Sequence, residues 1–139
     1  MTCDELIRQL EDCTLPAASF DHRAHVQAGF GYLQRHGYAG ALGAMASALR
    51  RFAAHHGKHG LYHETVTAAF LALIHQRMAE DLAARGEKIA LAGAQALDWE
   101  CFAASHPDLF ASDLLARYYS KDTLRSDLAR HCFVLPQAC

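Results

Sequence analysis

Apolar residues recur along this chain at the three- and four-residue spacing that places them on one face of an α-helix. Four long segments show this spacing: 2–13, 21–36, 39–56 and 61–84. In the last of them, Val66, Phe70 and Ile74 share one face. Shorter helices are predicted at 99–105, 108–119 and 120–132. No segment alternates apolar and polar residues for long enough to predict a strand.

The residues at the ends of these segments support the same elements. Thr2, Asp21, Asp98 and Ser120 stand where helices are expected to begin, and all four types are favoured N-caps. Gly37 and Gly57 stand where two of the long helices are expected to stop. Residues 86–97 are small and weakly patterned, which predicts a crossing segment. The pattern therefore predicts an all-α fold, a compact bundle of about four main helices followed by short C-terminal helices, in one domain spanning 1–139.

Composition narrows the class of protein. Of the 139 residues, 52% are hydrophobic, which is typical of a globular domain and excludes a disordered chain. The formal net charge is −2, and no basic run is longer than Arg50-Arg51, so we expect no nucleic-acid partner. No apolar run approaches the roughly 18 residues that a membrane span needs, so we expect no membrane segment.

Five cysteines stand far apart in the sequence: Cys3, Cys13, Cys101, Cys132 and Cys139. Their odd number and the absence of a CxxC pair argue against a disulfide scaffold. We therefore predict reduced thiols and a cytoplasmic location, since disulfides persist mainly in oxidising compartments.

Ten histidines are the unusual feature of the composition. His22 and His25 are three residues apart at the start of a predicted helix, so both imidazoles lie on one face. The segment Tyr62 to Thr65 adds His63 and Glu64 at the start of the longest helix. Two histidines with a third histidine or a carboxylate form the ligand set of catalytic zinc and of non-haem iron. We therefore predict a divalent transition metal, which is iron, zinc, copper or nickel, on His22, His25 and His63.

Glu64 is the predicted catalytic residue of this site. It is adjacent to His63, about 100° around the helix, so the two side chains do not share a face. His63 shares its face with Phe70 and Ile74, which favours His63 as the ligand and Glu64 as a proton-transfer group. The Glu64 face continues to His75, so His75 is an alternative partner for Glu64.

The other polar clusters also have plain structural interpretations. His55, His56 and His59 stand near a predicted helix C-terminus, where a positive charge is favourable. Arg50 and Arg51 either hold a substrate carboxylate or form a solvated helix face.

Three short segments resemble a group of small bacterial helical proteins whose activity is not established. They are F-x-H-x-x-H at Phe20–His25, Y-H-E-T at Tyr62–Thr65 and F-V-L-P at Phe133–Pro136. The resemblance implies that His22, His25, His63 and Glu64 belong to one site.

These observations predict a metal-dependent enzyme, an oxidoreductase or a hydrolase, that acts on a small-molecule substrate. Two other classes remain open at this point: a non-catalytic metal-binding or metal-sensing module, and a metal-free helical interaction protein. The sequence is compatible with a monomer or a homodimer.

Overall fold

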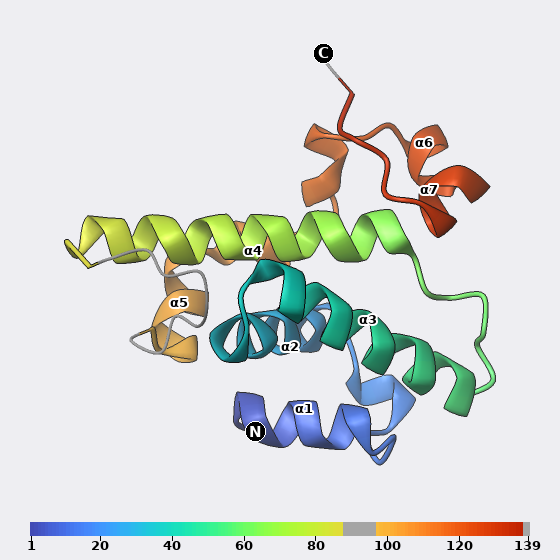
Figure 1. Cartoon of the computed structure of the whole chain (residues 1–139), viewed down its shortest axis with the longest axis horizontal. Coiled ribbons are helices and arrows are strands. Elements are labelled where there is room, and N and C mark those ends of the chain that lie inside the picture. Colours follow the sequence, from blue (N-terminus) through green and yellow to red (C-terminus); the bar gives the residue numbers. More distant parts are fainter. Residues whose placement is uncertain (88–96, 138–139) are drawn as a thin grey trace.

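A computed structural model describes residues 1–87 and 97–137, and in these ranges it contains helices and no strand. The main helices are α1 (Cys3–Glu11), α2 (His22–Arg35), α3 (Tyr38–His55) and α4 (Glu64–Ala84) (Figure 1). The prediction of an all-α helical bundle is confirmed. Most of the expected crossing segment 86–97 lies outside the described residues.

The predicted N-caps begin the helices because their side chains bind free backbone N–H groups. Thr2 accepts a hydrogen bond from the Glu5 backbone at 3.1 Å, and the Glu5 carboxylate accepts one from the Thr2 backbone at 3.0 Å. The Asp21 carboxylate accepts from the Ala24 N–H at 2.9 Å. A cap of this kind contributes about 1 kcal/mol to the stability of its helix.

Helix α2 lies at the centre of the bundle and packs against α1, α3 and α4. It carries Phe30 and Tyr32, which are almost fully buried. A Cβ at Gly31 would lie 2.7 Å from Cδ1 of Ile7, so a glycine at this position lets α1 approach α2 closely. The apolar stripes of all four helices meet in one core around α2.

The C-terminal part is more broken than the sequence predicted. It contains α5 (Trp99–Ser105), two 3₁₀ turns η2 (Pro107–Phe110) and η3 (Leu114–Arg117), α6 (Lys121–Arg125) and α7 (Asp127–His131). The single helix expected at 108–119 is therefore wrong. The helix expected at 120–132 is interrupted at Ser126, whose extended backbone lets its hydroxyl accept from the Ala129 N–H and start α7.

Helices α6 and α7 lie beside α4, on the side opposite α2 and α3 (Figure 1). The Thr65 hydroxyl on α4 is fully buried, donates to the Cys132 carbonyl at 2.9 Å and accepts from the Val134 N–H at 3.1 Å. Arg130 on α7 donates to the Gly60 carbonyl at 2.7 Å. These contacts fix both the C-terminal tail and the segment that precedes α4.

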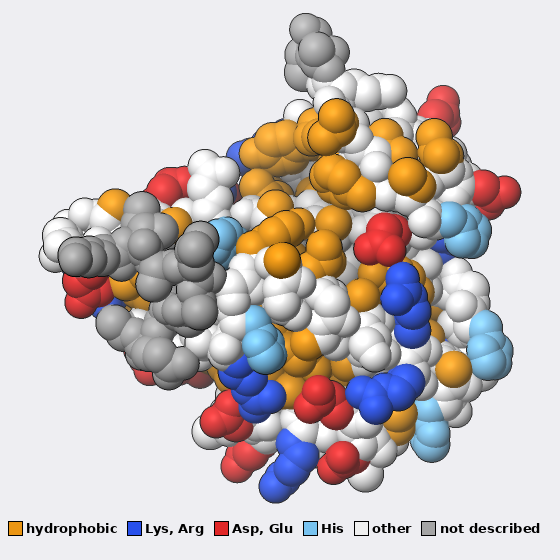
Figure 2. All heavy atoms as spheres, viewed as in Figure 1, with side chains coloured by type: hydrophobic (Ala, Val, Ile, Leu, Met, Phe, Trp, Pro, Cys, Tyr) orange, Lys and Arg blue, Asp and Glu red, His pale blue; other side chains and the backbone are white. Residues whose placement is uncertain are grey.

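The surface mixes apolar, charged and histidine side chains (Figure 2). Within residues 1–87 and 97–137, no helix combines the length and apolarity needed to cross a bilayer. Cys3, Cys13, Cys101 and Cys132 are free thiols. Cys139 lies outside the described residues.

Candidate functional site

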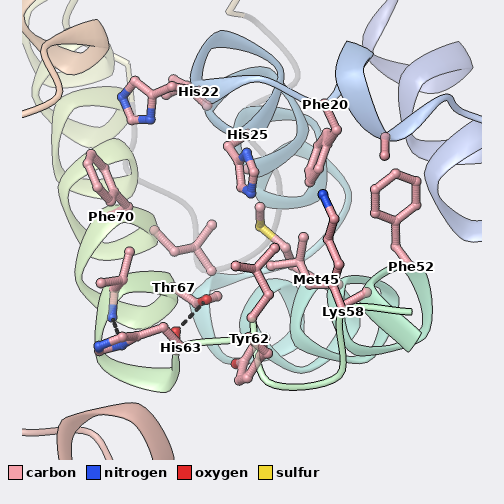
Figure 3. A pocket seen from close by; sticks show the side chains of 18 of the residues that line it. Phe20, His22, His25, Met45, Phe52, Lys58, Tyr62, His63, Thr67 and Phe70 are labelled. Carbon is pink, nitrogen blue, oxygen red and sulfur yellow. Dashed lines mark hydrogen bonds between the residues drawn. The ribbon is translucent and has the colours of Figure 1, made fainter. Parts of the chain in front are cut away.

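A cavity of about 420 Å³ lies among α2, α3, α4 and the segment that joins α3 to α4 (Figure 3). All of the described residues that line it fall between 17 and 74. Much of its wall is aromatic and aliphatic: Phe20, Val26, Met45, Phe52, Phe70 and Leu71. The cavity is open to solvent, since three of the residues that line it, His25, Lys58 and Leu61, are exposed.

The polar side chains of the wall include all three predicted metal ligands. The polar side chains of the wall are those of His22, His25, His56, Lys58, Tyr62, His63 and Thr67. His22, His25 and His63 therefore all lie in the wall of one cavity. Glu64 does not line the cavity, and in the described parts of the chain no carboxylate does.

His25 presents one free ring nitrogen to the cavity. Its Nδ1 lies 3.0 Å from the Asp21 carbonyl oxygen, which can only accept, so Nδ1 carries the proton. The ring stacks on Phe20 with centroids 3.9 Å apart, which fixes its plane. Desolvation by the surrounding atoms lowers the pKa of His25. The ring is therefore neutral near pH 7, with a lone pair on Nε2, and it points into the cavity (Figure 3).

His22 lies at another part of the wall. Its Nε2 donates to the Leu109 carbonyl at 3.0 Å, which leaves the lone pair on Nδ1. Its ring meets Phe70 edge to face, with centroids 5.1 Å apart. This hydrogen bond also ties α2 to the 3₁₀ turn η2.

His63 uses both of its ring nitrogens within the protein. Nδ1 accepts from the Val66 N–H at 3.1 Å, so His63 is the N-cap of α4. Nε2 donates to the Leu124 carbonyl at 2.6 Å. The ring is turned away from His25 (Figure 3). In this arrangement His63 has no free lone pair to offer a metal ion.

Glu64 forms hydrogen bonds that stabilise the segment preceding α4. Its carboxylate accepts from the Tyr62 hydroxyl at 3.1 Å and from the Arg50 guanidinium at 3.2 Å. The guanidinium also lies 4.5 Å from the centroid of the Tyr62 ring. Burial, together with Glu64, raises the pKa of Tyr62, so its hydroxyl stays protonated and donates. His75, the alternative partner, lies instead beside the Tyr38 ring.

In the described ranges, no group of three or more His, Cys, Asp or Glu side chains is placed to hold a metal ion. The metal on His22, His25 and His63 stays a prediction. For that site to form, His63 would have to release the Val66 N–H, which occupies the lone pair on its Nδ1, whereas Nε2 could continue to donate to the Leu124 carbonyl. His22 and His25 need no such change, since each already keeps one lone pair.

The sequence did not indicate that two further residues, His56 and Lys58, belong to the wall of the cavity. It indicated His55, His56 and His59 only as residues near a helix C-terminus. His56 Nε2 is buried and has no hydrogen-bond partner among the described residues. The Lys58 side chain makes no ion pair with any part of the chain that the structure describes. Gly57 has a φ of 71° and turns the chain back over the cavity. This glycine is the feature of the sequence that could have indicated the turn.

The chain was compared with protein families, with curated proteins and with solved structures. No family model, curated protein or solved structure matches it. The resemblance to small bacterial helical proteins thus stays a prediction, and the site has to be interpreted from its own geometry.

Proposed function

We propose that this chain binds a small, largely apolar molecule in the cavity between α2, α3 and α4, with His25 as a polar contact. The observation that carries the proposal is the cavity itself, which has one imidazole of fixed orientation aimed into it. Its volume of about 420 Å³ lies in the range of small-molecule sites, roughly 300–1,000 Å³.

The wall of this open cavity presents apolar side chains to water when the cavity is empty. Transfer of apolar surface out of water is favourable, by roughly 25 cal/mol for each Å² that is buried. An occupant that contacts Phe20, Phe52 and Phe70 would cover that surface. The Nε2 of His25 would then accept a hydrogen bond, or a proton, from a hydroxyl of that occupant.

A neutral fluorescent probe, N-phenyl-1-naphthylamine, tests this proposal. We expect one probe per chain, with fluorescence enhanced and shifted to the blue. The variant Val66→Phe adds a ring to the cavity wall and should weaken binding at least tenfold. Its control, Ala72→Phe, places the same ring on the exposed face of α4 and should leave binding unchanged. Absence of binding, or equal binding by both variants, would refute the proposal.

A metal-dependent enzyme is the second candidate, and one observation favours it. His22 and His25 each donate one ring N–H to a backbone carbonyl, as metal-binding histidines commonly do, and each keeps a lone pair. Elemental analysis of protein purified without a histidine tag tests this candidate. Stoichiometric metal that is lost in His22→Ala and in His25→Ala supports it. If Glu64→Gln keeps the metal and loses turnover, Glu64 is the proton-transfer group. Absence of metal at stoichiometric level would refute it.

A further inference from the structure

We propose that the occupant is a monocarboxylic acid with an apolar body, and that Lys58 holds its carboxylate. This inference rests on the proposed function, because it names the chemical class of ligand for the same cavity. Its basis is the distribution of charged side chains around the wall.

The wall can carry positive charge and has no negative side chain to balance it. Lys58 supplies an ammonium group, and among the described residues no Asp or Glu lines the cavity. Two carboxylates stand next to wall residues in the sequence, and both already have partners: Glu64 is bound to Arg50 and Tyr62, and Asp21 accepts from the Ala24 N–H. An ammonium ligand would therefore meet like charge, whereas a carboxylate would meet its complement.

Lys58 is positioned to reach an occupant. Its ammonium group points toward the space between His25, Phe20 and Phe52 (Figure 3). It has no side-chain partner in the described parts of the chain, so an ion pair with a ligand would replace no existing contact.

The rest of the wall argues against a phosphate ester. Phosphates are typically held by arginine forks or by free N–H groups at a helix N-terminus. No arginine lines the cavity in the described ranges. The N-termini of α2 and α4 are already capped, by Asp21 and by His63. A single lysine beside an apolar chamber matches a monoanion with a hydrophobic body.

Displacement of the bound probe by three molecules that share one ring system tests the inference. They are 2-naphthoate, 2-naphthalenemethanol and 2-naphthalenemethylamine, which are anionic, neutral and cationic at pH 7. We expect 2-naphthoate to displace the probe at a concentration about tenfold lower than the alcohol, and the amine to be the weakest. Lys58→Met keeps the apolar stem and should remove most of the advantage of the acid, with the alcohol unchanged. Lys58→Arg should retain it, and Lys121→Met, at an exposed position on α6, is the control.

The outcomes separate the two proposals. If the probe binds in the cavity but the acid has no advantage over the alcohol, the carboxylate inference fails and the proposed function stands. The same holds if the advantage persists in Lys58→Met. If the probe does not bind at all, the proposed function fails and the inference fails with it.

Discussion

Replacement of His63 separates a structural role from a metal-binding role. His63→Ala removes the N-cap of α4, which contributes about 1 kcal/mol. It also removes the hydrogen bond to the Leu124 carbonyl, which contributes about 1 kcal/mol more. We therefore expect the free energy of unfolding to fall by about 2 kcal/mol in metal-free buffer. His63→Asn keeps a side chain that caps well and should lose only about half of that amount.

Urea unfolding followed by far-UV circular dichroism, in buffer with a chelator, measures these differences. The slope of unfolding against urea should not change, because the fold stays the same. His59→Ala is the matched control, since His59 is exposed and lies in the same connection. The structural reasoning is refuted if His63→Ala is as stable as the wild type in chelator. If a loss then appears only when metal is added to both proteins, His63 acts as a ligand and not as a cap.

Three further predictions follow from the contacts described above. Thr65→Val removes a buried hydroxyl that makes two hydrogen bonds to the C-terminal tail. The tail amides should exchange their hydrogens faster, and urea unfolding should show a free energy of unfolding lower by about 2 kcal/mol. Hydrogen bonding from Arg77 lowers the pKa of Asp108 to about 2, so Asp108→Asn should cost about 1 kcal/mol at pH 7. This loss should shrink as pH falls from about 4 toward 2, where wild-type Asp108 is protonated, and a constant loss would contradict it. Burial raises the pKa of the Cys3 thiol, so iodoacetamide at pH 8 should modify it more slowly than the exposed Cys132, as mass spectrometry can show.

The main helices were predictable because local spacing and local caps act in the same direction. Thr2 and Asp21 start α1 and α2 through contacts within three residues, which a sequence displays directly. The breaks after α5 were not predictable from spacing. Ser126 suits both a helix interior and an N-cap, and only the packed chain shows that its hydroxyl starts α7. Short helices have few turns over which a pattern can accumulate, so tertiary contacts decide where they end.

The candidate site was predictable in position but not in orientation. Spacing indicated that His22 and His25 share one helix face, the usual ligand sets of metal sites suggested His63 as the third member, and all three line the cavity. The direction of each ring depends on carbonyl partners that stand far away in sequence, such as Leu109 and Leu124. Lys58 was missed because its position depends on a turn that folds the α3–α4 connection back over the cavity.

Within the described parts of the chain, the residues that line the cavity all fall between 17 and 74, one continuous stretch, and this has a consequence for the order of folding. The contacts that hold the C-terminal part on α4 span long loops: 61 residues separate His63 from Leu124, and 70 separate Gly60 from Arg130. Closing such loops costs more entropy than joining neighbouring helices, so we expect the C-terminal part to dock late. A nascent or partly folded chain would then already enclose the cavity. A ligand that binds there would accelerate folding, in addition to slowing the unfolding of the finished protein.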